Sequence, residues 1–203
     1  VASWLVTGPR PRHPRSGTRG LEGVPTRMVG RGAELKQLQS AFERLCAGQR
    51  LAVLSVEAEA GVGKSRLRQE FEAWAETQPV RPLMFRGRAT PATAAQPYGL
   101  LRDIVAGRLH IADDDTLGAA RRKLEAALVP LFVHDDGPEL AEAHAHLLGH
   151  LVGIDARASR HLRGILDDPR QIRSRAFHAA AQWLRRLAAQ QGLPLLLLLE
   201  DLH

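Results

Sequence analysis

Apolar residues recur along the chain at two different spacings, and each spacing predicts a different kind of element. In residues 33–47 and 64–78 they recur every three or four positions, as on one face of an amphipathic helix. Residues 51–56 and 82–87 are instead short, nearly continuous apolar runs, which are typical of buried strands. The first structured part of the chain is therefore predicted to be helix, strand, helix and strand.

The middle of the chain, about 98–191, shows helical spacing almost throughout. We expect it to be interrupted at Pro130, at Asp-Asp-Gly 135–137 and at Asp-Asp-Pro 167–169, because proline and glycine end helices. The helices expected there are 98–109, 116–128, 138–153 and 171–191.

A final apolar run, 193–199, predicts another buried strand. Strands separated by helices indicate an α/β fold, with a parallel sheet flanked by helices and a helical middle region.

Residues 1–27 show neither spacing and are rich in Arg, Pro and Gly, so we expect a disordered tail. Met28 directly precedes the first periodic stretch, and an alternative is that the tail lies upstream of the true start. The tail holds five arginines and one glutamate, which give +4 of the net charge of +6. Its only aromatic residue is Trp4, and Arg replaces Lys almost everywhere in the chain, so direct nucleic-acid binding is not expected.

Other bounds point to a cytoplasmic protein. Cys46 is the only cysteine, so no internal disulfide can form. The longest apolar run, 193–199, is far shorter than the roughly 18 residues that a membrane span needs.

The strongest chemical signal is residues 51–67, LAVLSVEAEAGVGKSRL, in which a small-residue loop joins an expected strand to an expected helix. This order, with Gly63-Lys64-Ser65 opening the helix, is that of a phosphate-binding P-loop. Lys64 would supply a point charge for the β- and γ-phosphates, and the Ser65 hydroxyl would be a Mg²⁺ ligand. The pattern also asks for glycine where the chain has Ala58, which is tolerable only if φ is negative there. The alternative is an ordinary strand-to-helix turn.

A second signal is LLLLLED at 195–201, an apolar strand that ends in Glu200 and Asp201. Ligands of open α/β sheets bind at the carboxyl ends of the strands, so a carboxylate there can hold Mg²⁺ or orient a water molecule. This is the pattern of a Walker B motif. The alternatives are a solvated strand end or a helix N-cap at Asp201.

Several segments together carry a family resemblance. MVGRGAELKQL, VEAEAGVGKSRL, FRGRA, PYGLLRDIV, RAFHAAAQWLRRLA and LLLLLEDLH occur in this order. Residues 28–203 therefore resemble the AAA-type ATPase module of STAND-class signalling proteins. Such modules are found in LuxR-type transcription regulators and beside some adenylate cyclase domains.

The resemblance implies ATP or ADP with Mg²⁺, and a regulatory switch acting on an attached output domain. The implied metal ligands are Ser65 and Glu200, and the implied catalytic residues are Lys64, Glu200 and Asp201. The residues implied to lie around the adenine and the phosphates are Val29, Gly30, Arg31, Glu59, Ala60, Gly61, Val62, Gly63, Lys64, Ser65 and Arg66.

The chain departs from the family pattern in two further ways. The acid pair reads Glu-Asp where many P-loop ATPases read Asp-Glu, which leaves open the division of roles between Glu200 and Asp201. The family motif also continues beyond His203, so we expect a truncated module with an incomplete sheet, a missing output domain of helix-turn-helix, cyclase or kinase type, and weak or no ATP hydrolysis.

Three histidines, His144, His146 and His150, cluster in AHAHLLGH. The pair at i, i+4 could ligate zinc, but neither a cysteine nor a metalloprotease glutamate accompanies it. We therefore expect surface histidines on an amphipathic helix.

Two other functions remain open from the sequence. One is a small-molecule or nucleotide kinase built on the same P-loop. The other is a non-hydrolysing interaction fragment in which the helical middle packs against a partner.

Overall fold

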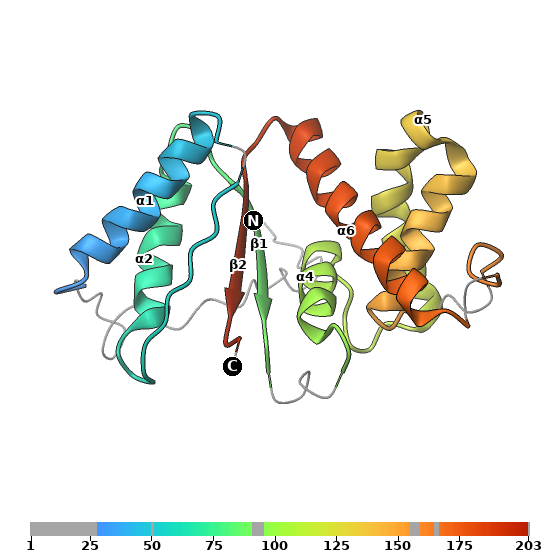
Figure 1. The fold of residues 1–203 in the computed structure, drawn as a ribbon, viewed down its shortest axis with the longest axis horizontal. Helices are drawn as coiled ribbons and strands as arrows, with labels where there is room; N and C mark the ends of the chain where they lie inside the picture. Colours follow the sequence, from blue (N-terminus) through green and yellow to red (C-terminus); the bar gives the residue numbers. More distant parts are fainter. Residues whose placement is uncertain (1–27, 50, 91–95, 155–158, 165–166, 203) are drawn as a thin grey trace, which may run out of the picture. The chain divides into compact units, whose positions relative to one another are not determined.

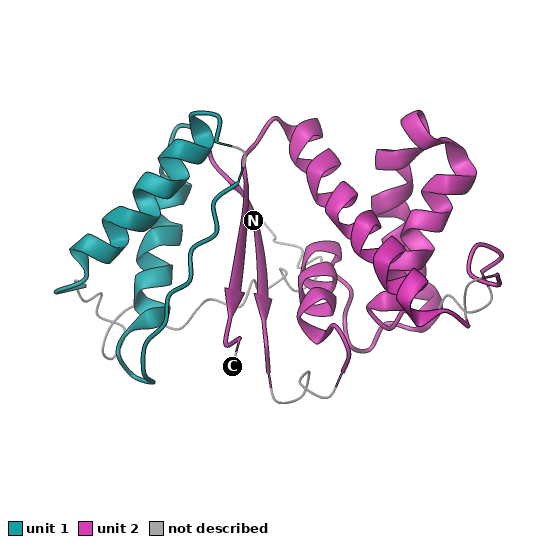
Figure 2. Cartoon of the chain, viewed as in Figure 1, with its two compact units in different colours: residues 1–79 teal, residues 80–203 magenta. Residues whose placement is uncertain are grey.

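The computed structural model describes residues 28–49, 51–90, 96–154, 159–164 and 167–202, and Figure 1 shows their fold. The predicted tail, 1–27, lies outside the described residues. The chain divides into two compact units, residues 1–79 and 80–203 (Figure 2), and each is described by itself.

Unit 1 is built on two helices, α1 (Gly32–Cys46) and α2 (Lys64–Glu76). Both helices were predicted, to within two residues at each end. They pack through three aromatic rings, with the Phe42 centroid 6.5 Å from that of Phe71 and 5.8 Å from that of Trp74. Edge-to-face contacts of this kind fix two helices against each other.

The predicted buried strand at 51–56 is wrong. The segment has no strand structure, and the side chain of Val53 is 85% exposed. A strand forms only when its backbone N–H and C=O groups pair with a neighbour, and no segment among the described residues pairs with this one. An apolar run alone predicts burial, but it does not supply the partner.

Unit 2 contains the sheet, a parallel pair formed by β1 (Leu83–Arg88) and β2 (Leu195–Glu200). Leu83 lies opposite Leu195, and Arg88 lies opposite Glu200 at the carboxyl end of the pair. Both strands were predicted. Helices with a small parallel sheet are consistent with the α/β prediction.

Three helices separate the strands in the chain: α4 (Gly99–Leu109), α5 (Leu117–Leu151) and α6 (Pro169–Gln191). The α5 segment is two helices joined at Gly137, whose φ of 77° and ψ of 166° are not helical. The break predicted at 135–137 is confirmed, whereas the one predicted at Pro130 is wrong. Leu128 and Phe132 are fully buried on the inner face while Pro130 is exposed, so core packing carries the helix through the proline and water can reach the carbonyl that it frees.

The core of unit 2 lies between β1 and the three helices. Gly87 is required on the inner face of β1, because a Cβ there would lie 2.6 Å from the Ile104 side chain. Phe85 on the same face meets Trp183 of α6 edge to face, with centroids 5.6 Å apart. The core thereby fixes the carboxyl end of β1 against α4.

Candidate functional site

The loop before α2 is exposed and depends on glycine. Gly61 and Gly63 have φ values of 81° and 96°, which favour glycine, and Gly63 is the N-cap of α2. Space lies open beside both α-carbons, since a Cβ on either would meet nothing within 4 Å. The loop thus presents backbone and the positive end of a helix without side-chain obstruction, which suits a phosphate group.

The residue in the first glycine position of the pattern does not need to be glycine. Among the described non-glycine residues, φ is positive only at Tyr98, His110 and Asp201. Ala58 therefore has negative φ, and its methyl group is compatible with the loop.

Lys64 folds back over the loop that precedes it. Its ammonium group donates to the backbone oxygen of Ala58 and, at 2.9 Å, to that of Glu59. The cation is therefore held at the mouth of the loop, beside the exposed residues Ala60 and Val62. An incoming phosphate oxygen would have to replace these two carbonyl acceptors.

The neighbours of Lys64 on α2 differ in their freedom. Ser65 is exposed, so its hydroxyl is accessible to a ligand. Arg66 makes an ion pair with Glu70 at 2.7 Å, one turn along the helix, so it is held along the helix surface.

The predicted adenine segment leads into α1. Val29 is exposed, and Gly30 has a φ of 77°. The Arg31 guanidinium donates to Glu34 at 2.8 Å, and this hydrogen bond lowers the pKa of the Glu34 carboxyl group. The segment is thus shaped by a left-handed glycine and a local ion pair.

In unit 2 the acid pair stands where β2 ends. Glu200 is the last residue of the strand, and Asp201 turns the chain with a φ of 57°. The Asp201 carboxylate accepts a hydrogen bond of 2.8 Å from Nε of Arg88, the last residue of β1. This hydrogen bond raises the pKa of Arg88 further.

Arg88 also connects the acid pair to α4. Its backbone N–H donates to Asp103 Oδ2 at 2.8 Å. The next amide, that of Ala89, donates to the Glu200 carbonyl at 3.0 Å. The sequence analysis did not assign Arg88 to the site; its place at the end of one parallel strand, level with the acid at the end of the next, was the signal available.

The predicted site residues thus fall into two groups. The loop residues and the 29–31 segment belong to unit 1, and the acid pair with Arg88 belongs to unit 2. Their chemistry fits a nucleotide with Mg²⁺: open glycine backbone and an ammonium group for phosphate, and hydroxyl and carboxylate oxygens for the ion. The described residues contain no cluster of three or more His, Cys, Asp or Glu arranged for a metal, as expected for an ion held mainly by phosphate and water.

The histidine cluster is not a set of surface residues, so that expectation is wrong for His146. It is only 4% exposed, its Nδ1 lies 2.7 Å from Ser159 Oγ, and its Nε2 lies 2.7 Å from Glu125 Oε1. Arg121 donates to the same Glu125 carboxylate at 2.7 Å. His146 is a satisfied polar residue of the interior, which its apolar neighbours in AHAHLLGH could have indicated.

Comparison with known proteins gives one match. A family model described as the AAA ATPase domain matches residues 27–203. No curated protein and no solved structure matches the chain. Within the part of the chain that the structure describes, no helix is both long and apolar enough to cross a membrane.

Proposed function

Because the chain belongs to the AAA ATPase domain family, we propose that it binds ATP or ADP with Mg²⁺ as a nucleotide-dependent regulatory switch. The observation that carries the proposal is the loop at 58–63, with its two left-handed glycines and the Lys64 ammonium held at its mouth. A loop of this form binds the phosphates of a nucleotide and discriminates little against the base.

In this proposal the chain's own groups divide the work. Backbone N–H groups around Gly61 and Gly63 donate to phosphate oxygens, and Lys64 exchanges its carbonyl acceptors for them. Ser65 and Glu200 hold the Mg²⁺, which when bound neutralises the phosphate charge. Val29, Gly30 and Arg31 lie beside the adenine.

The acid that remains, Asp201, would orient water. Its carboxylate is engaged by Arg88, so it is not free for that role in this state. We therefore expect slow hydrolysis. This suits a switch in a signalling or transcription-regulatory protein, where the time spent in each nucleotide state matters more than turnover.

The first experiment is a titration of the protein with Mg-ATP and Mg-ADP, with Lys64→Ala as the test variant. Removing a cation that contacts phosphate should weaken binding about tenfold or more. Lys36→Ala is the matched control, because Lys36 is an exposed lysine on α1 outside the loop, and it should bind like the wild type. Equal affinity in all three proteins would contradict the proposal.

Steady-state turnover tests the second part. Slow hydrolysis that depends on Lys64 supports the switch, whereas a rate typical of a working enzyme, about 1 per second or more, would contradict it. Transfer of phosphate to an added small substrate would instead identify a kinase.

A further inference from the structure

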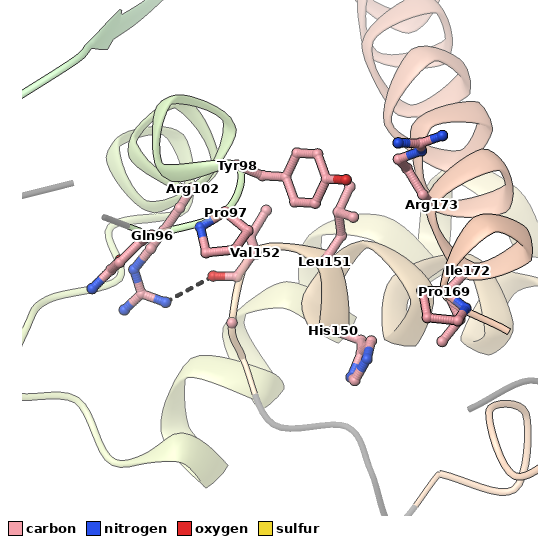
Figure 3. Close-up of a pocket in the computed structure, with 11 residues that line it drawn as sticks. Gln96, Pro97, Tyr98, Arg102, His150, Leu151, Val152, Pro169, Ile172 and Arg173 are labelled. Carbon is pink, nitrogen blue, oxygen red and sulfur yellow. Dashed lines mark hydrogen bonds between the residues drawn. The ribbon is translucent and has the colours of Figure 1, made fainter. Parts of the chain in front are cut away.

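Unit 2 contains a cavity of about 590 Å³ that the nucleotide chemistry does not use (Figure 3). Three elements form it: the start of α4, the end of α5 and the start of α6. Its volume lies within the usual range for sites that bind small molecules.

The lining has apolar walls and basic polar groups. Leu151, Val152 and Ile172 supply apolar surface, while Arg102 and Arg173 bring guanidinium groups from α4 and α6. No carboxylate side chain lines the cavity. Two cations without an acid create a positive potential that favours an anion.

The nearest acid in sequence, Asp168, has a local function. Its carboxylate accepts the backbone N–H groups of Arg170 and Gln171 at 3.1 and 3.0 Å and so caps α6. It neutralises the helix end without entering the lining of the cavity.

Two of the lining side chains are held in place before any ligand arrives. Arg102 donates to the Val152 carbonyl at 2.8 Å, which orients its guanidinium and leaves other N–H groups for a ligand. The Tyr98 ring packs edge to face on Phe177 at 5.4 Å, and its backbone has a φ of 60°. A non-glycine residue in this conformation carries strain, which is found often at ligand sites.

The Arg173 guanidinium, by contrast, makes no hydrogen bond or ion pair with any described residue. Figure 3 shows it entering from α6, across from Tyr98 and Arg102 of α4. It is therefore the group most available to an incoming anion.

We propose that this cavity is a second ligand site, which binds a small organic anion. A phosphate or carboxylate group would be held by Arg102 and Arg173, because guanidinium forks match both groups. The body of the ligand would be apolar or aromatic, lying against Tyr98, Leu151 and Ile172.

The site also has a short structural connection to the acid pair. Arg102 in the cavity is followed by Asp103, which holds the backbone N–H of Arg88, and Arg88 holds Asp201. A ligand that shifts α4 would thus alter the hold on Asp201. This regulatory role rests on the proposed nucleotide function, whereas the binding of an anion does not.

The test uses phenyl phosphate and benzoate as probes, with benzyl alcohol as the uncharged counterpart, followed by calorimetry or NMR titration. It is done in the Lys64→Ala variant, so that the nucleotide loop contributes little to phosphate binding. Arg173→Gln should weaken binding of the preferred anion about tenfold. Arg175→Gln, an exposed arginine of the same helix outside the lining, should change it less than about twofold.

Stronger binding of phenyl phosphate than of benzoate would assign the site to phosphate esters, and the reverse order would assign it to carboxylates. No saturable binding of either anion at millimolar concentration would overturn the proposal, as would equal losses in both arginine variants or equal binding of benzyl alcohol. None of these results depends on ATP binding, so failure here is distinct from failure of the proposed nucleotide function.

Discussion

At the scale of single residues, the ion pair between Arg88 and Asp201 is the contact with the clearest consequence for chemistry. Arg88→Ala releases the Asp201 carboxylate, so we expect ATP turnover to rise about two- to fivefold, a modest change because exposed ion pairs are weak. Mg-ADP affinity should change little, since neither residue is proposed to contact the phosphates. Arg86→Ala on the same strand is the control, and unchanged turnover in Arg88→Ala would show that the ion pair does not restrain Asp201.

His144 gives a second residue-level prediction, on pH and stability. Burial lowers its pKa below the ordinary value of 6.5; Asp136 opposes the shift, while His178 and Arg186 add to it. The unfolded chain therefore binds more protons than the folded one just below pH 6.5, so stability should rise with pH through that window and fall as the solution is acidified. The midpoint of urea unfolding should show this fall between pH 7 and 5.5.

His144→Phe should reduce the pH dependence, because it removes the titrating group and keeps a ring against Phe132, whose centroid lies 4.7 Å away. His134→Gln is the control, since His134 is exposed on the same helix. An unaltered pH profile in His144→Phe would assign the effect to another group.

At the scale of elements, the break in α5 depends on one glycine. Gly137 has φ and ψ values that are open almost only to glycine, so Gly137→Ala should destabilise the protein by about 1–3 kcal/mol. Gly118→Ala is the matched change in the first turn of the same helix. A Cβ there would meet only the end of Arg122 at 3.5 Å, so it should stabilise by about 0.5–1 kcal/mol. Chemical denaturation measures both, and opposite signs are the expected result.

The same elements show how far the sequence could be read. Helical periodicity reports which face of a segment is buried, and it located α1, α2, α4 and α6 to within two residues. The run at 51–56 failed because a strand requires a partner, which is a property of the whole sheet and not of the segment.

The site was partly predictable for a related reason. Gly63 and Lys64 form a local pattern, and the structure builds them as a left-handed cap and a cation folded over its own loop. Arg88 and Asp201 are 113 residues apart, so their ion pair depends on strand register. The buried pairing of His146 with Ser159 was hidden for the same reason, since it joins two elements across the fold.

At the scale of the whole molecule, the two groups of site residues can be tested separately by hydrogen exchange. The loop at 58–63 is exposed and outside regular structure, so without ligand its amides should exchange rapidly. Mg-ATP should slow exchange across 58–66, because the backbone N–H groups become donors to phosphate. Lys64→Ala should remove this protection, and Lys36→Ala should retain it.

Exchange in residues 200–202 tests the other group. If Glu200 holds the Mg²⁺, protection there should require the metal with ATP and should be lost with ATP in excess EDTA, while weaker protection at 58–66 remains. Glu200→Gln should give the same pattern with Mg²⁺ present, because the amide is a poorer ligand for the ion. Protection confined to 58–66 under every condition would mean that the loop binds nucleotide without the acid pair, and would assign the metal to phosphate, water and Ser65.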